Sequence, residues 1–573
     1  MSAGTDVTIA TSIQASPPGV PVGALSLCAA LRASGYTADF RDFQEFDGGD
    51  RPEPEGFARW LADSSDLLGI STLSSSLPLV LLATRALKAQ RPERTIILGG
   101  PGTSGIEAPV LEAFPSVDVV VRGEGEDTLI ELVEALRGRR PLSDVRGITY
   151  RSGGTVIRNP DRPRIGDLDR LPSPYSGAVH LDACRDPRWS RFAIFGILTS
   201  RGCPYSCAFC AIPAVWRGDT RRRSLTPILE EIRVLREEYG LDRFRILDDT
   251  FTLDRRAVLD LCDALARTGW SMRWLCHGRI DHMDEELLAS LRSAGCVGIL
   301  FGVESGSDRI LKRIGKGFTV GRALDVIEMC ADQLRVEASF IWGFPFETLD
   351  DFYDTLIALL AVHAMGGRTK LTLLMPDPAS RLTREYKDDL ESTLRDDVLL
   401  VSGKTHAFHC GPEVRALVQA HPSLFSAYFH LRSPEFETKC AYIRRHATDT
   451  EPGAAVTLGP DADERTVGSA GTEGELPPTV RESAPRPDGR LPAASAGVLQ
   501  RTVGRRRFFF DVENFRLFSA TPGYERVLQA CHDRRRHADL VAELASRSGR
   551  PSAEVEGIVD TMLGALRRDG LVG

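Results

Sequence analysis

The stretch Leu198-Thr-Ser-Arg-Gly-Cys203-Pro-Tyr-Ser-Cys207-Ala-Phe-Cys210 decides how the rest of the chain is interpreted. Its cysteines have C-x3-C-x2-C spacing and follow an apolar run, residues 192–198, that predicts a strand. Thiolates are preferred ligands of iron-sulfur clusters, and three on one loop can hold three irons of a 4Fe-4S cube, leaving the fourth open to a small molecule. A zinc knuckle or unrelated thiols are the alternatives, but zinc sites usually show two C-x2-C pairs or interspersed histidines.

The cysteine spacing resembles the signature of the radical S-adenosylmethionine (SAM) superfamily. Phe209 matches the family's aromatic residue before the third cysteine, and Arg201-Gly202 matches a common lead-in to the first. The resemblance implies that the three cysteines bind a 4Fe-4S cluster, whose open iron is chelated by the amino and carboxylate groups of SAM. It also implies an electron donor such as flavodoxin or ferredoxin.

Length and composition are compatible with a multidomain enzyme. The 573 residues suffice for about three or four domains of ordinary size. A formal net charge of −8 is mild for this length and predicts no nucleic-acid partner. The twelve cysteines are spread out, and neither a signal pattern nor a long apolar span is visible. These features predict a protein of the reducing cytoplasm with no membrane partner.

Residues 1–145 are expected to form a doubly wound, Rossmann-like or flavodoxin-like α/β domain. Helical patterns alternate with short apolar runs, at residues 7–13, 37–40, 67–70, 95–98 and 118–121. A helix near residues 23–34 ends at Gly35, in the position of a left-handed C-cap. Ligands of such sheets bind beyond the carboxyl ends of the strands, so the loops there are the informative ones.

Three of those loops are rich in glycine, hydroxyl and acidic residues. They read Gly69-Ile-Ser-Thr-Leu-Ser-Ser75, Leu98-Gly-Gly-Pro-Gly102 and Val121-Arg-Gly-Glu-Gly-Glu-Asp127. Glycines let a flat ligand approach the backbone, and hydroxyls can hydrogen-bond its polar rim. Neither G-x-G-x-x-G after the first strand nor a Walker A sequence is present, which disfavours a nucleotide. In this order the loops resemble the cobalamin-binding domain that precedes the radical domain in one branch of the superfamily.

The resemblance implies a set of cobalamin contacts: Ser71, Thr72, Ser74, Gly99, Gly100, Gly123 and Glu124. The D-x-H-x-x-G motif that supplies a histidine to cobalt in many such domains is missing, and residues 1–150 contain no histidine. We therefore expect the lower face of cobalt to be open, bound to water or met by another kind of side chain.

Strand and helix patterns alternate again across residues 191–380, after a connector at 146–190. Helices such as 228–239 and 258–267 separate the expected strands, at 244–247, 273–275, 297–302, 336–341 and 370–374. With the strand before the cysteines this makes six units, the number in the family's partial (β/α)6 barrel of the TIM type. Catalytic groups of such barrels gather at the carboxyl ends of the strands.

Polar segments follow three of these strands where the family binds SAM. Asp248-Asp249 corresponds to a segment near the methionyl amine, Glu304-Ser305 to a "GxES" element near the ribose, and Gly343 opens a turn resembling "GLPGET". The resemblance assigns to SAM the residues Phe209, Asp248, Glu304, Ser305 and Gly343. Carboxylates suit a ligand with an ammonium, a sulfonium and ribose hydroxyls, although acidic residues at strand ends are often helix N-caps.

Other residues give weaker indications. Arg221-Arg222-Arg223 is typical of solvated surface, or could hold an anionic group. Cys410 has His406 and His409 beside it, a weak metal-site pattern. Four further thiols are expected to pack in the core, Cys262, Cys276, Cys296 and Cys330. No catalytic acid or base can be named.

Beyond the barrel we expect a helical extension at 381–446, a disordered linker at 447–497 and a small winged-helix-like α+β module at 498–573. The module should contain a hairpin and three helices: strands at 507–512 and 515–518, helices at 524–531, 538–546 and 555–568. Its tail resembles the peptide-binding domain of pyrroloquinoline quinone biosynthesis, in which a leader peptide adds a strand to the sheet edge.

The domain order resembles cobalamin-dependent radical SAM (class B) methyltransferases of natural-product or modified-peptide biosynthesis. Such enzymes use two molecules of SAM on a small-molecule or peptide substrate: one donates a methyl group by way of cobalamin, and the other yields a 5′-deoxyadenosyl radical that removes a substrate hydrogen. A non-methylating member that rearranges or cyclises its substrate has the same motifs. A cobalamin or redox sensor is a further alternative, and a methylthiotransferase fits less well because no C-terminal RNA-binding barrel is visible.

Overall fold

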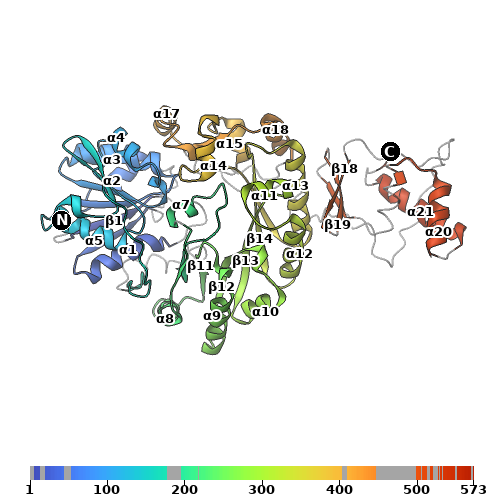
Figure 1. Ribbon diagram of the computed structural model, residues 1–573, viewed down its shortest axis with the longest axis horizontal. Coiled ribbons are helices and arrows are strands. Elements are labelled where there is room, and N and C mark those ends of the chain that lie inside the picture. Colours follow the sequence, from blue (N-terminus) through green and yellow to red (C-terminus); the bar gives the residue numbers. More distant parts are fainter. Residues whose placement is uncertain are drawn as a thin grey trace.

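The computed structural model describes residues 5–12, 20–43, 53–176, 195–216, 218–402, 410–446, 498–504, 506–512, 516–519, 527, 530–531, 533–548, 551–568 and 572. Figure 1 shows an N-terminal α/β domain, a central barrel and a small C-terminal part in a row. The linker expected at 447–497, most of the helix expected at 524–531, and His406 and His409 lie outside the described residues. No described helix has both the length and the apolar character needed to cross a bilayer.

The N-terminal domain is built on a seven-stranded sheet of order β2-β1-β3-β4-β5-β6-β7. Its first five strands are parallel, as expected for a doubly wound fold: β1 (Val7–Thr11), β2 (Ala38–Asp42), β3 (Leu67–Ser71), β4 (Thr95–Gly99) and β5 (Val119–Val121). The order 2-1-3-4-5 is that of flavodoxin-like folds, whose ligands bind at the carboxyl ends of the strands. The expected fold class is confirmed.

Helices cover both faces of this sheet. They are α1 (Val22–Ala33), α2 (Pro54–Trp60), α3 (Leu77–Gln90), α4 (Glu107–Ala113) and α5 (Glu126–Leu136). Apolar residues of α1 and α5 share a core cluster with the barrel, whereas those of α2, α3 and α4 share a second cluster with apolar residues of 394–399 and 410–429. The N-terminal domain is thus packed against the barrel on one face and against the helical extension on the other.

The segment expected as a connector begins inside the sheet. Strands β6 (Ile148–Ser152) and β7 (Thr155–Arg158) extend it with an antiparallel hairpin that pairs with β5. Gly153 and Gly154, both with positive φ, form its two-residue turn. This hairpin escaped prediction because the expected strands were those of a purely parallel sheet.

The barrel is a six-stranded parallel sheet of order β15-β14-β13-β12-β11-β8, the expected number of units. Its strands are β8 (Gly196–Ile197), β11 (Arg243–Ile246), β12 (Arg273–Gly278), β13 (Cys296–Glu304), β14 (Arg335–Trp342) and β15 (Arg368–Leu373). The surrounding helices are α8 (Leu225–Glu237), α9 (Arg255–Thr268), α10 (Glu285–Ser293), α11 (Asp308–Ile314), α12 (Val320–Ala331) and α13 (Leu349–Ala364).

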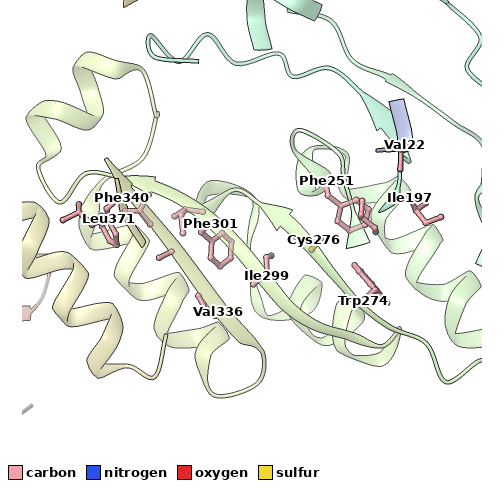
Figure 2. Close-up of a cluster of buried hydrophobic side chains, with 14 of the residues drawn as sticks. Val22, Ile197, Phe251, Trp274, Cys276, Ile299, Phe301, Val336, Phe340 and Leu371 are labelled. Carbon is pink, nitrogen blue, oxygen red and sulfur yellow. The ribbon is translucent and has the colours of Figure 1, made fainter. Parts of the chain in front are cut away.

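A continuous apolar layer runs across the barrel strands. Figure 2 shows it from Leu371 and Phe340 through Phe301 and Trp274 to Val22 of α1 in the neighbouring domain. The four thiols expected in the core, Cys262, Cys276, Cys296 and Cys330, are buried there. Each exposes at most 4% of its surface, which leaves them inert as ligands and places the chemistry at the strand ends.

The extension after β15 packs over the N-terminal domain. It contains α14 (Arg381–Glu385), α15 (Asp396–Ser402), α17 (Pro412–Ala420), α18 (Phe436–His446) and an antiparallel pair, β16 (Leu390–Ser392) with β17 (Phe429–Leu431). Phe425 contacts Phe114 edge to face, and the Tyr428 hydroxyl donates a hydrogen bond to the Ser75 carbonyl. The extension therefore connects the barrel to the loop after β3.

The C-terminal part has one strand more than expected. Strands β18 (Val498–Val503), β19 (Arg506–Asp511) and β20 (Arg516–Ser519) form an antiparallel sheet, and α20 (His537–Ser548) and α21 (Ser552–Arg568) follow. Phe508, Phe510 and Leu517 belong to the barrel's core cluster, whereas the helices have a cluster of their own. The α+β content is as expected, but the winged-helix likeness stays a prediction.

Candidate cofactor site

The cysteine loop starts from a short hairpin beside the barrel. Strand β9 (Ser200–Arg201) pairs with β10 (Arg221–Arg222), and the loop then runs to α7 (Ile212–Trp216). The Sγ atom of Cys203 lies 3.4 Å from the Thr250 hydroxyl, and that of Cys207 lies 3.9 Å from the Gly315 carbonyl. The loop is thus held between the ends of β11 and α11.

The three thiols fit a cluster. Burial raises the pKa of the Cys207 thiol, an effect that Lys316 and Arg279 oppose, and burial raises the pKa of Cys210 to about 12. Without metal the Cys207 and Cys210 thiols therefore stay protonated at neutral pH, so iron binding must displace their protons. No three metal-binding side chains of the described residues converge on one ion. A 4Fe-4S cube does not need three side chains that converge on one ion, because each thiolate binds a different iron.

Gly202, directly before Cys203, allows the loop to turn. Its φ is +102°, and a Cβ there would lie 1.9 Å from the Asp219 carbonyl oxygen. We predict that Gly202→Ala lowers the amount of iron bound after reconstitution by several-fold, because the backbone of the hairpin would have to move. Iron and sulfide analysis measures this. Gly218→Ala is the matched control: its φ is +72°, but nothing lies within 4 Å of the added Cβ. Equal iron contents in the two variants would refute the steric argument.

The Asp248 carboxylate binds the backbone segment that leads into the cysteine loop. It is fully buried and accepts hydrogen bonds from the backbone amides of Thr199 and Ser200, at 2.7 and 3.1 Å, and from both of their hydroxyls. Asp249, its neighbour, accepts from the Gly202 amide at 3.2 Å, and burial raises its pKa to about 6. Of the two carboxyls, Asp249 is the one with acceptor capacity left toward the cysteine loop.

Glu304 lies at a strained position. Its φ is +74°, which is rare for a residue other than glycine, and the register of β13 against β14 shifts there as in a β-bulge. Its carboxylate accepts from Lys316 at 3.2 Å and raises the pKa of Cys207 electrostatically. Strain at a strand end is typical of functional sites. Ser305 differs: it is fully buried, and its hydroxyl bonds with that of Thr355 at 3.0 Å.

The turn after β14 is held by a buried ion pair that includes Lys439, a residue that the sequence did not predict to be part of the site. Gly343 has a φ of +83°, and its amide donates to the Glu347 carboxylate at 2.8 Å. Glu347 is paired at 3.1 Å with Lys439 of α18, and both side chains are fully buried. Phe344, in the same turn, meets Phe209 edge to face with ring centroids 6.3 Å apart. Nothing in the sequence around Lys439 distinguishes it from a surface lysine of an amphipathic helix.

Two of the expected cobalamin loops lie against each other. A Cβ on Gly100 would lie 2.7 Å from the Thr72 carbonyl oxygen, and one on Gly102 would lie 2.4 Å from the Leu73 carbonyl carbon. The Thr72 hydroxyl donates to the Gly99 carbonyl, at 3.0 Å. Ser71 and Ser74 lie half-buried in the same place. Only glycine at positions 100 and 102 therefore lets the loops after β3 and β4 pack this closely, and the contact lies at the carboxyl ends of the two strands.

Glu124 has a different environment from the other residues assigned to cobalamin. Gly123, with a φ of +72° and open space around it, belongs to the loop after β5. The Glu124 side chain is only 4% exposed and forms ion pairs with Arg201 at 2.8 Å and Arg221 at 2.7 Å. Arg223 pairs with Glu231 at 2.7 Å. Two of the three arginines of the run are therefore buried ion-pair partners, so the run is not a solvated surface.

The comparisons with known proteins agree with this geometry. Residues 11–133 match the B12 binding domain, and residues 197–359 match the Radical SAM superfamily. An uncharacterized methyltransferase of Pyrococcus horikoshii, PH0819, is 31% identical over 319 residues, which cover 55% of this chain and 68% of that protein. The chain belongs to the radical SAM superfamily. Accordingly, this radical SAM enzyme uses a 4Fe-4S cluster, SAM and cobalamin.

One further relative of this radical SAM enzyme and one solved structure of similar fold are named for different reactions. The anaerobic magnesium-protoporphyrin IX monomethyl ester cyclase of Rubrivivax gelatinosus is 28% identical over 382 residues, 65% of this chain and 67% of the cyclase. The radical SAM methyltransferase TsrM of Kitasatospora setae, solved with cobalamin and a [4Fe-4S] cluster bound, matches with a TM-score of 0.56 and 19% identity, over 68% of this chain and 81% of TsrM. The likeness to TsrM is one of fold.

Proposed function

We propose that this radical SAM enzyme is a cobalamin-dependent C-methyltransferase in natural-product or modified-peptide biosynthesis. The observation that carries the proposal is the contact between strand-end loops of the two domains. The Ser74 hydroxyl, after β3, lies 3.3 Å from the Asp377 carboxylate, after β15. A corrinoid at the first loop and a substrate at the barrel mouth would then be neighbours, as methyl transfer between them requires. The name of PH0819 as a methyltransferase supports the same reaction.

The cofactors would supply a transferable methyl group and a radical, while the protein binds, orients and excludes water. Cys203, Cys207 and Cys210 would hold the cluster, with Asp249 and Glu304 on the side where SAM binds. Other assigned SAM and cobalamin contacts keep their roles in this proposal except Asp248, Ser305 and Glu124, whose polar groups are engaged within the protein.

Two cations lie beside the cluster loop. Arg279 is 8% exposed, stands 3.6 Å above the ring of Tyr205 and donates to the Asp281 carboxylate at 2.9 Å, while Lys316 pairs with Glu304. Both act electrostatically on Cys207. Because a thiolate-bound cluster is anionic, we infer that these cations stabilise it and favour its reduction by a small electron-carrying protein such as flavodoxin or ferredoxin.

A peptide is the substrate class that the C-terminal part supports. Three antiparallel strands precede the helices, and β18 and β20 each pair only with β19 within the described residues. A leader peptide could add a strand at either edge of such a sheet. A small-molecule substrate remains the other class, since TsrM is solved with tryptophan as substrate.

The products formed from SAM test the proposal. We predict that anaerobically reconstituted protein, given cobalamin, a strong reductant and a substrate, forms 5′-deoxyadenosine and S-adenosylhomocysteine in equal amounts. Liquid chromatography with mass detection measures both. Protein with an intact cluster that forms neither product would contradict the proposed function.

The alternative is a radical SAM enzyme that uses cobalamin without transferring a methyl group. The likeness to the Rubrivivax gelatinosus cyclase favours it, because the alignment covers 65% of this chain and 67% of the cyclase. Such an enzyme would release 5′-deoxyadenosine without S-adenosylhomocysteine. A sensor, the third possibility, would need no SAM site, and the strained Glu304 beside the cluster loop argues against it.

A further inference from the structure

Four charged side chains form a buried network between the N-terminal domain and the cysteine loop. Arg201 donates to Glu124 at 2.8 Å and to Glu126 at 2.7 Å, and Arg221 donates to Glu124 at 2.7 Å. Exposure of these side chains is between 4% and 12%. The glutamates come from the loop after β5 and the first turn of α5, and the arginines come from β9 and β10. The network is thus a contact between domains.

The Glu124 carboxylate accepts three hydrogen bonds from within the protein. Its Oε1 atom is paired with Arg201, and its Oε2 atom accepts from Arg221 and from the Ile165 amide at 2.8 Å. The register of β9 against β10 also places Arg201 directly opposite Arg221. Like charges opposite each other repel, and a carboxylate between them removes that repulsion.

Arg201 is two residues before Cys203, so whatever fixes Arg201 also fixes the start of the cysteine loop. Asp248 holds Thr199 and Ser200 from the barrel side. The glutamates hold Arg201 from the side of the N-terminal domain. We propose that Glu124 and Glu126 are positioning residues that set the place of the cluster relative to cobalamin. The inference goes beyond the proposed function, because it holds whether or not a methyl group is transferred.

The distance between the two cofactors tests this proposal. In reduced enzyme loaded with cluster and cob(II)alamin, both metal centres are paramagnetic, and pulsed dipolar electron paramagnetic resonance reports the distribution of distances between them. We expect a narrow distribution in the native protein and one at least twice as broad in Glu126→Gln and Arg201→Gln. Glu134→Gln is the matched control, since Glu134 lies on the same helix and pairs with Arg140 inside the N-terminal domain. Its distribution should equal the native one.

Variants that no longer bind cobalamin cannot be studied by the distance between the cofactors, so they need a second measurement. Hydrogen exchange of the backbone amides at residues 200–210, in cluster-loaded protein, should be about tenfold faster in Glu124→Gln and Glu126→Gln and unchanged in Glu134→Gln. The exchange rate in the double variant Glu126→Gln/Arg201→Gln should not exceed that in Arg201→Gln alone, because both changes remove the same contact between Glu126 and Arg201. Arg201→Lys keeps the positive charge but lacks the two-pronged guanidinium group that reaches both glutamates. Its exchange rate should lie between those of the native protein and Arg201→Gln. Native-like distances and exchange in the glutamate variants would overturn the proposal.

Discussion

Cys210→Ala is expected to reduce 5′-deoxyadenosine formation from SAM to the level of a protein-free control. With one of three thiolates removed, the cluster loses one of its three protein ligands, and one of its irons is no longer held by the loop. No electron can then reach SAM. The fold should survive, since Cys210 is half-buried on a loop and packs in no core cluster. Visible absorbance of the cluster and product analysis measure the two effects.

Cys330→Ala is the control for this experiment. Its thiol is fully buried in α12, packs as a small apolar group and contacts none of the cofactor residues. We expect native absorbance and native 5′-deoxyadenosine formation, with a loss of stability of about 1 kcal/mol for the vacated volume. A Cys210→Ala protein that retains a native cluster and cleaves SAM would refute the assignment of the cluster ligands.

Lys439→Met is expected to lower the free energy of unfolding by about 3–5 kcal/mol, because it leaves the Glu347 carboxylate buried without its cation. Lys439 also donates to the Glu347 carbonyl at 2.7 Å and to the Ser433 hydroxyl at 3.1 Å, so the change frees three acceptors. Methionine fills a similar volume, which limits the loss of packing. Urea unfolding followed by circular dichroism measures the difference.

The pH dependence of this variant has a definite sign. Burial raises the pKa of the Glu347 carboxyl, and Lys439 opposes that rise. Without the lysine, the folded-state pKa lies further above the unfolded value of about 4.3, so stability is lost as the pH rises through the folded-state pKa. Lys439→Met should therefore be less destabilising at pH 5 than at pH 8. The double variant Glu347→Gln/Lys439→Met should regain most of the loss, and Lys312→Met, on the surface, should be neutral. A single variant as stable as the double one would contradict the buried-pair argument.

Much of the fold could be predicted because buried parallel strands are short apolar runs. Residues 67–70 and 336–341, for example, are such runs and lie within β3 and β14. The cysteine loop could be placed because its residues are contiguous. Strands β6 and β18 were missed, since neither is a continuous apolar run and each pairs with an antiparallel neighbour that the local pattern does not reveal.

The roles of acidic residues were harder to predict than their locations. Asp248 and Glu124 follow β11 and β5, as the strand-end argument requires, but Asp248 bonds to the backbone of Thr199 and Glu124 pairs with Arg201. Which donor reaches a carboxylate depends on side chains that are distant in sequence, 49 residues away for Thr199 and 77 for Arg201. Sequence patterns carry no information on such pairings.

The contact between the C-terminal sheet and the barrel determines where the chain can be shortened. Arg501 pairs with Asp350 and Asp354 of α13, and Phe510 packs against Tyr353 with ring centroids 6.3 Å apart. A fragment ending at residue 446 would retain every candidate cofactor ligand, yet it would uncover the apolar outer wall of the barrel and leave uncompensated acidic charge around it. Such a fragment would be prone to self-association, so for recombinant work residues 498–519 belong with the barrel.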